Sequence, residues 1–397
     1  MLHPTDHSSI PRTWRLGLTV YAASSLLVAL VVLLVFVQLR PDPGSLLACF
    51  ARWDGISYAD ICGAGYAVDP DRTLSFFPGY PLLARPLTWL GLPPVLALLL
   101  VAHLCLAAAF VLLAVYLRDR FPDAGEELVL AVLLALAFLP AGFYFRMALS
   151  ESLFLVLLVG TMVAMQRQVA PLGIALLIGA ATSVRLVGVV LVPVFWLHLW
   201  RLTPSPGRFL LRAALLTPLC AWGVAGFMLW CAWNYGDPFI YAARIYTVAA
   251  EGKGPDNKLM ALLTLEPLWC NFVPGSPCYY GAQDPHQDPW LGMFLANPVF
   301  MVLTALLIVI GGVRRWLNVD ELLLSSGLLV LPYLSRSHEM CMGAGARYAA
   351  VVFPAFIVLG RLGLAVPPLV ARGALVAMAL LLSVYSAKYA LNYPFFY

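Results

Sequence analysis

The chain has 397 residues, of which 62% are hydrophobic and only 11% are charged, with a formal net charge of +4. Soluble proteins carry roughly 25% charged residues, so this composition excludes an ordinary soluble domain. The modest positive charge does not predict a nucleic-acid partner, because basic residues in a membrane protein report first on its orientation. We therefore expect an integral membrane protein.

Apolar blocks recur along the whole chain, and a membrane-spanning helix needs about 20 residues. Block 17–39 has no charged residue, and block 94–117 has His103 as its single ionisable residue. Stretch 169–200 is long enough for two short helices interrupted near Arg185. Further blocks cover 128–145, 152–165, 213–233, 291–312, 322–334, 348–359 and 373–386. The pattern predicts an all-α polytopic protein, one domain over residues 1–397, with about 11 transmembrane helices.

The orientation of these helices follows from the short loops between them. Block 17–39 is longer than the apolar core of about 7–15 residues found in signal peptides, so we expect it to remain as a span. With the N-terminus inside, the short inner loops contain Arg118, Arg201 and Arg314, as the positive-inside rule requires. Two long loops, about 40–91 and about 234–290, then lie on the non-cytoplasmic side.

The first long loop is rich in aromatic residues and proline, which favours packed interfacial structure over disorder. Residues 53–62 are expected to form a short helix along the membrane surface, with Asp54 as its N-cap and Gly63 and Gly65 ending it. Segment 75–87 contains three prolines, which are expected to break it up. Its aromatic side chains belong at the depth of the lipid headgroups.

The second long loop combines tyrosine and tryptophan with Lys253 and Lys258. Aromatic rings stack on sugars and lysine binds phosphate as a point charge, although an aromatic belt at the membrane interface explains the rings equally. Cys270 and Cys278 flank a Pro-Gly turn in the same loop. They form a small disulfide loop if this side is oxidising, or remain two thiols.

Asp54 is the strongest candidate for a catalytic residue. It stands beside Arg52 and Trp53 at the start of the expected interfacial helix. A carboxylate in that place can accept the proton of an incoming hydroxyl as a general base. It can equally serve only as a helix cap.

Other ionisable residues occur at the expected outer ends of spans. Glu151 follows Ser150 there, and such residues tend to face a polar cavity, although capping of the helix by Ser150 and Glu151 is a sufficient structural explanation. Arginines at these ends can bind a lipid phosphate bidentately or extend toward the headgroups. The basic and acidic residues concerned are Arg185, Arg336, His338, Glu339 and Arg347.

Three motifs in order resemble the PIG-V family of GT-C mannosyltransferases, which use a dolichyl-phosphate-mannose donor. The resemblance covers about residues 52–188. The family's Arg-Ser-Asn-Gly appears here as Arg-Leu-Val-Gly, which leaves the acceptor open. The motifs are Arg52-Trp53-Asp54 with Phe76-Phe77-Pro78-Gly79-Tyr80-Pro81, Ser150-Glu151-Ser152-Leu153-Phe154, and Ser183-Val184-Arg185; beyond them Arg347-Tyr348 also agrees.

The resemblance implies a lipid-phosphate sugar donor, a glycolipid or glycan acceptor, and inversion to an α-mannoside. Asp54 would act as the base. From the motifs and from the residue chemistry above together, we expect binding roles for Arg52, Trp53, Tyr80, Glu151, Arg185, Lys253, Lys258, His338 and Arg347. No cofactor is implied, and the sequence shows no convincing metal-ligand cluster.

Two alternatives remain. A transporter or flippase of lipid-linked sugars is expected to have acids at mid-membrane and paired half-repeats, and neither is evident in the sequence. A protein O-mannosyltransferase typically has two adjacent acids where this chain has Asp54-Gly55. The short, Ala/Leu-rich chain favours a bacterial plasma membrane over the endoplasmic reticulum.

Overall fold

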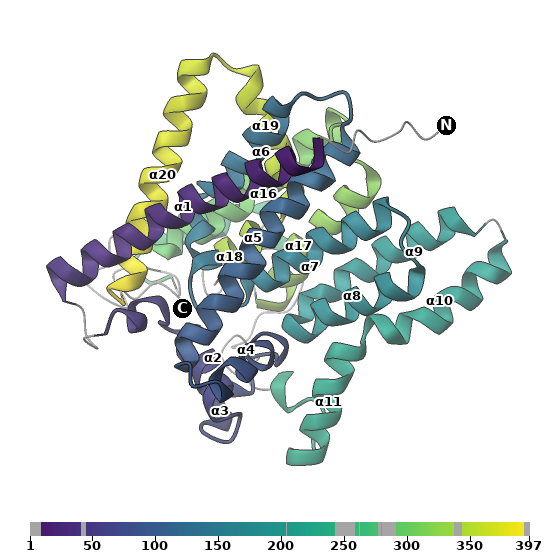
Figure 1. Cartoon of the computed structure of the whole chain (residues 1–397), viewed down its shortest axis with the longest axis horizontal. Coiled ribbons are helices and arrows are strands. Elements are labelled where there is room, and N and C mark those ends of the chain that lie inside the picture. Colours follow the sequence, from purple (N-terminus) through teal and green to yellow (C-terminus); the bar gives the residue numbers. More distant parts are fainter. Residues whose placement is uncertain are drawn as a thin grey trace.

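The computed structural model describes residues 9–40, 45–203, 205–242, 259–261, 263–276, 279, 291–336 and 344–392. Within these ranges the chain is helical and contains no strand. This confirms the all-α prediction. Figure 1 shows long helices crossing one another. The short helices α2 (Asp54–Gly63), α3 (Pro70–Thr73) and α4 (Gly79–Trp89) gather at one edge of the molecule.

Four helices in the described part of the chain are long and apolar enough to cross a membrane. They are α1 (Ser9–Leu39), α5 (Pro94–Arg120), α16 (Met293–Val313) and α20 (Pro368–Ala390). Their exposed side chains are largely apolar, for example Leu30 and Leu34 on α1 and Leu369 and Leu380 on α20. Such surfaces suit contact with lipid, so the helices indicate an integral membrane protein.

Two further helix pairs cover a span's length only if each bent pair is counted as one, which raises the number to six. Helix α6 (Glu126–Ala137) and the 3₁₀ helix η2 (Pro140–Arg146) meet at 78°, and α10 (Pro206–Cys220) and α11 (Trp222–Tyr235) meet at 52°. The other apolar blocks form shorter helices. These are α7 (Glu151–Gln166), α8 (Pro171–Val184), η3 (Leu186–Val190), α9 (Leu191–Leu202) and α19 (Phe353–Ala365).

The remaining described helices connect these elements. Helix α17 (Val319–Arg336) follows α16, and α18 (Gly345–Ala350) precedes α19. Short turns of helix occur at η1 (Leu47–Phe50), α14 (Glu266–Trp269) and η4 (Cys270–Phe272). The interruption expected near Arg185 is confirmed, because Arg185 is the extended residue between α8 and η3.

The short helix expected at 53–62 is present as α2 (Asp54–Gly63). Its N-cap, however, is Trp53, at a φ of 54°, and Asp54 is the first helical residue. The expectation that Asp54 caps the helix is therefore wrong. Because Asp54 is the first helical residue, its side chain can point away from the helix axis toward other elements.

Segment 75–87 also differs from expectation, because its prolines do not break it. Helix α4 (Gly79–Trp89) runs through Pro81 and Pro86. Pro81 lies in the first turn, where backbone N–H groups have no partner within the helix. Pro86 removes one hydrogen bond only three residues before the helix ends, so little of the helix depends on it. The preceding short helix α3 (Pro70–Thr73) is capped by Asp69, which accepts from the Arg72 N–H.

Glycine residues let α4 and α11 approach the backbone of α8 closely. A Cβ on Gly79 would lie 2.7 Å from the Ser183 carbonyl oxygen, and one on Gly223 would lie 2.3 Å from the Gly179 carbonyl oxygen. Both contacts are closer than any side chain tolerates, so only glycine permits α4 and α11 to pack here. These contacts place the start of α4 beside the end of α8, where Arg185 leaves the helix.

Candidate functional site

A cavity of about 350 Å³ lies where α2, η3, α17 and α18 meet. This volume is within the range of about 300–1,000 Å³ common for ligand sites. Charged and hydroxyl side chains line it together with apolar side chains. The polar lining includes Asp54, Tyr58, Ser75, Arg185, Ser335, Arg347 and Tyr348, and the apolar lining includes Leu186, Val187, Leu331 and Pro332.

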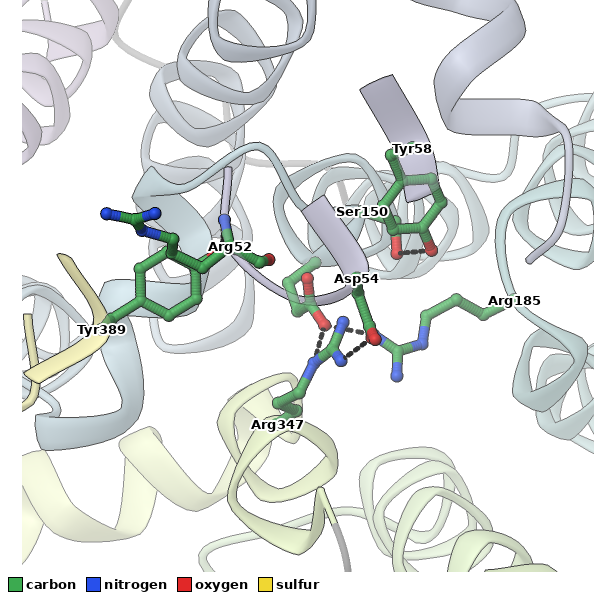
Figure 2. Close-up of polar contacts among 8 residues, drawn as sticks. Arg52, Asp54, Tyr58, Ser150, Arg185, Arg347 and Tyr389 are labelled. Atoms are coloured by element: carbon green, nitrogen blue, oxygen red, sulfur yellow. Dashed lines mark hydrogen bonds and ion pairs between the residues drawn. The ribbon is translucent and has the colours of Figure 1, made fainter. Parts of the chain in front are cut away.

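Asp54 and Arg347 form an ion pair at the wall of this cavity (Figure 2). The Nη1 group of Arg347, on α18, donates to Oδ2 of Asp54 at the start of α2. The arginine side chain is only 8% exposed, whereas the aspartate side chain is 34% exposed. The carboxylate therefore remains open to the cavity while the guanidinium is held inside the protein.

Glu151 holds two arginines with a single oxygen. Its Oε1 accepts from Nε of Arg347 and from Nη1 of Arg185, both at 2.6 Å. Glu151 is fully buried at the first turn of α7 and does not line the cavity. It lies behind the arginines and aligns them, because a buried carboxylate must be paired.

Aromatic rings complete the support of both arginines. The guanidinium carbon of Arg185 lies 4.9 Å from the ring centre of Tyr348 and 6.0 Å from that of Phe154. That of Arg347 lies 5.5 Å from the ring centre of Tyr144. These distances are within the reach of cation–π attraction, about 6 Å. The rings restrain the two planar groups, so their remaining N–H donors have fixed directions.

Arg52 takes a different place from the one expected. Its guanidinium donates to the carbonyl oxygen of Ala390, at 3.3 Å from Nε and 3.0 Å from Nη2, and points away from Asp54 (Figure 2). Tyr389 adds a second link, since its hydroxyl donates to the Arg52 carbonyl oxygen at 2.9 Å. Arg52 is the sequence neighbour of Asp54, but the contact to the Asp54 carboxylate comes from Arg347. Arg52 ties the start of α2 to the end of α20.

The other expected residues of the first loop divide between two places. Trp53 lines a smaller cavity of about 40 Å³, together with Asp54, Arg347 and Tyr389. Tyr80 is fully buried and donates to the Leu98 carbonyl oxygen at 2.9 Å. Its ring does not line the main cavity, so Tyr80 packs α4 against α5.

Three expected binding residues, Lys253, Lys258 and His338, lie outside the described residues. Arg336 ends α17, but nothing is described of its side chain, and Glu339 lies outside the described part. Cys278, which would pair with Cys270 in the disulfide alternative, is outside it too. These predictions stay predictions.

The structure adds Tyr58 to the site. It follows Asp54 by one helical turn, lines the main cavity, and donates to Oγ of Ser150 at 3.0 Å. Burial raises the pKa of Tyr58 to about 12, so its phenol stays protonated and is unsuited to act as a base. Helical spacing from Asp54 was a usable signal for Tyr58, whereas no sequence pattern pointed to Tyr389.

The described residues include no group of three or more His, Cys, Asp or Glu side chains placed to hold a metal ion. The site consists instead of a partly exposed carboxylate, Asp54, next to two guanidinium groups that Glu151 aligns. Such a set can bind a phosphate and accept a proton beside it. No protein-family model, curated protein or solved structure shows a significant match to the chain.

Proposed function

We propose that this protein is a membrane mannosyltransferase that transfers mannose from a polyprenyl-phosphate-mannose donor to a glycolipid or glycan acceptor. The observation that carries the proposal is the convergence of Asp54, Arg185 and Arg347 on one cavity. The arginines supply the donors that a phosphate needs, and the carboxylate supplies a base within the same cavity. The motif resemblance to PIG-V-type enzymes supports mannose as the sugar.

The lining of the cavity suits an amphiphilic donor. Its apolar lining includes Leu186 and Val187 on η3 and Leu331 and Pro332 on α17. An isoprenoid chain next to the phosphate would contact these side chains, while the sugar would lie toward Asp54. A free nucleotide sugar has no lipid chain that would contact these apolar side chains.

In the proposed reaction the acceptor hydroxyl attacks the anomeric carbon of the donor from the face opposite the phosphate. The new bond joins the acceptor oxygen to that carbon, and the bond from the carbon to the phosphate oxygen breaks. Asp54 receives the hydroxyl proton, and the lipid phosphate leaves with its charge compensated by Arg185 and Arg347. The anomeric configuration inverts from β to α.

The finer architecture belongs to the same proposal. If each short or broken apolar helix contributes a crossing, the protein has about 11 spans of GT-C type. The N-terminus is then cytoplasmic, and the site opens on the non-cytoplasmic face of a bacterial plasma membrane. The short helices α2, α3 and α4 lie along that face.

The decisive experiment incubates the purified full chain with polyprenyl-phosphate-[³H]mannose and a cell lipid extract. We expect label in a glycolipid or glycan product, and no transfer from GDP-[³H]mannose. Polyprenyl-phosphate-[³H]glucose tests the sugar in a parallel reaction. Movement of the labelled donor across proteoliposomes without any new glycosidic product would replace the proposal with a transporter.

A further inference from the structure

Four charged side chains among the described residues of the site are linked by ion pairs. Arg347 is bound to both Asp54 and Glu151, and Arg185 is bound to Glu151. Two positive and two negative charges cancel, so the set as it stands has no net charge to attract an anion. A phosphate that binds Nη1 of Arg347 must compete with the Asp54 carboxylate for that donor.

The two carboxylates differ in how readily they can give way. Glu151 is fully buried, and its Oε1 serves both arginines. Asp54 is the more exposed partner, at 34%, and binds Arg347 through Nη1. Losing Glu151 would leave buried guanidinium groups uncompensated, which is costly, whereas Asp54 can turn into open space.

A second cavity offers Asp54 that space. Asp54 and Arg347 line both the main cavity and the neighbouring cavity of about 40 Å³, beside Trp53 and Tyr389. A carboxylate displaced from Arg347 therefore stays at the site and keeps access to an acceptor. Once displaced, it is no longer stabilised by the guanidinium and becomes a stronger base.

We propose that the Asp54–Arg347 ion pair is the resting form of the site, and that the donor's phosphate takes the place of Asp54 on Arg347 while Glu151 holds the arginine in position. Donor binding itself then frees the base, so Asp54 gains its full basicity only when a donor is present. Glu151 is a positioning residue that acts through the arginines. The inference rests on the proposed function, because it takes Asp54 as the base and Arg347 as a phosphate ligand.

The test measures the affinity of undecaprenyl phosphate, the donor without its sugar, for the purified full chain in detergent. Removing the competing carboxylate by Asp54→Asn should tighten binding about tenfold, within the usual range for coupled sites. The matched control is Asp71→Asn, which changes an exposed acid of the same loop. We expect the control to bind as the wild type does.

A double-mutant cycle separates displacement from a general loss of negative charge. Arg347→Lys keeps the positive charge but loses the planar fork whose Nη1 donates to Asp54 while its Nε donates to Glu151. The gain from Asp54→Asn should therefore largely disappear in the Arg347→Lys background. If Asp54→Asn still tightens binding tenfold in the Arg347→Lys background, Asp54 acts only by repelling the phosphate charge. That result would overturn the inference.

Glu151→Gln tests the positioning role with the same change of charge as Asp54→Asn. It should weaken binding of undecaprenyl phosphate, opposite in direction to Asp54→Asn, because the arginines lose their anchor. Thermal unfolding compared with the wild type shows whether Glu151→Gln is folded. If Glu151→Gln is not folded, the double-mutant cycle of Asp54 and Arg347 still tests whether the phosphate displaces Asp54. Equal tightening by both variants would overturn the positioning role.

The outcomes also distinguish this inference from the proposed function. If the wild type and Asp54→Asn bind undecaprenyl phosphate with equal affinity, the phosphate does not displace Asp54. If the wild type still transfers mannose in that case, the mannosyltransferase proposal stands. Failure of every variant and of the wild type to bind undecaprenyl phosphate removes the donor site, and both proposals fail together.

Discussion

Arg347 donates to Asp54 from a position 293 residues further along the chain. The contact joins the first turn of α2 to α18 and lies at the wall of a cavity that Arg185 also lines. It makes the Asp54 carboxylate part of a charged network instead of a helix cap. The following predictions depend on this arrangement.

Asp54→Asn should abolish most transfer. The substitution keeps the size of the side chain and removes its basicity, and general-base assistance contributes typically about 10²–10⁴-fold in rate. The initial rate of [³H]mannose transfer by the purified variant measures the loss. Asp69→Asn serves as the control, since Asp69 caps α3 and does not line the cavity. A folded Asp54→Asn protein with half of the wild-type rate would show that another group is the base.

Arg185→Lys and Arg347→Lys should each raise the KM for the donor, by about tenfold, with a smaller effect on kcat. Lysine keeps the charge but loses the planar set of donors that binds Glu151 and a phosphate together. Steady-state kinetics with varied donor concentration measures both constants.

The control for these two variants is Arg72→Lys. Arg72 pairs with Asp60 in the same outer loop, with 44% of its side chain exposed. Pairs of this kind contribute little, typically about 0–1 kcal/mol. Donor KM should therefore stay unchanged in Arg72→Lys, and an unchanged KM in both site variants as well would separate the arginines from phosphate binding.

Arg146→Leu should destabilise the protein strongly. The buried guanidinium of Arg146 donates to the Gly142 carbonyl oxygen at 2.7 Å, the Ala137 carbonyl oxygen at 3.2 Å and Oγ of Ser24 at 2.6 Å. Each group left unpaired by the change costs about 1–3 kcal/mol, so thermal unfolding in detergent should shift down by several degrees. Arg167→Leu is the comparison, because Arg167 is half exposed and pairs with Asp119 at the surface. Equal shifts for both variants would mean that Arg146 does not hold the bend between α6 and η2.

The two long outer loops should lie on one face of the membrane. The test uses a variant from which the other reactive cysteines have been removed. Asp71→Cys and Asp237→Cys each introduce a single cysteine into this variant, and a membrane-impermeant thiol reagent then reports which side of the membrane it occupies. Both residues are exposed, so both should label in intact cells. Labelling at one position alone would place the loops on opposite faces and separate Asp54 from the second loop.

Local signals in the sequence determined several elements of this protein. The run of apolar residues predicted α1 and α5, the polar interruption at Arg185 separated α8 from η3, and the aromatic loop contained α2. These features follow from backbone propensity and hydropathy, which act within about 20 residues. The prolines of α4 misled the prediction, because a proline breaks a helix only where it removes a needed hydrogen bond.

The tertiary structure decided the partners within the site. Local sequence offered Arg52 as the neighbour of Asp54, but Arg52 is bound to Ala390 and Arg347 takes that place. Glu151, read from the sequence as a helix-end acid, is fully buried between two arginines. A buried charge must find a partner wherever the packing of helices brings one, and that packing brings together residues that no local pattern connects.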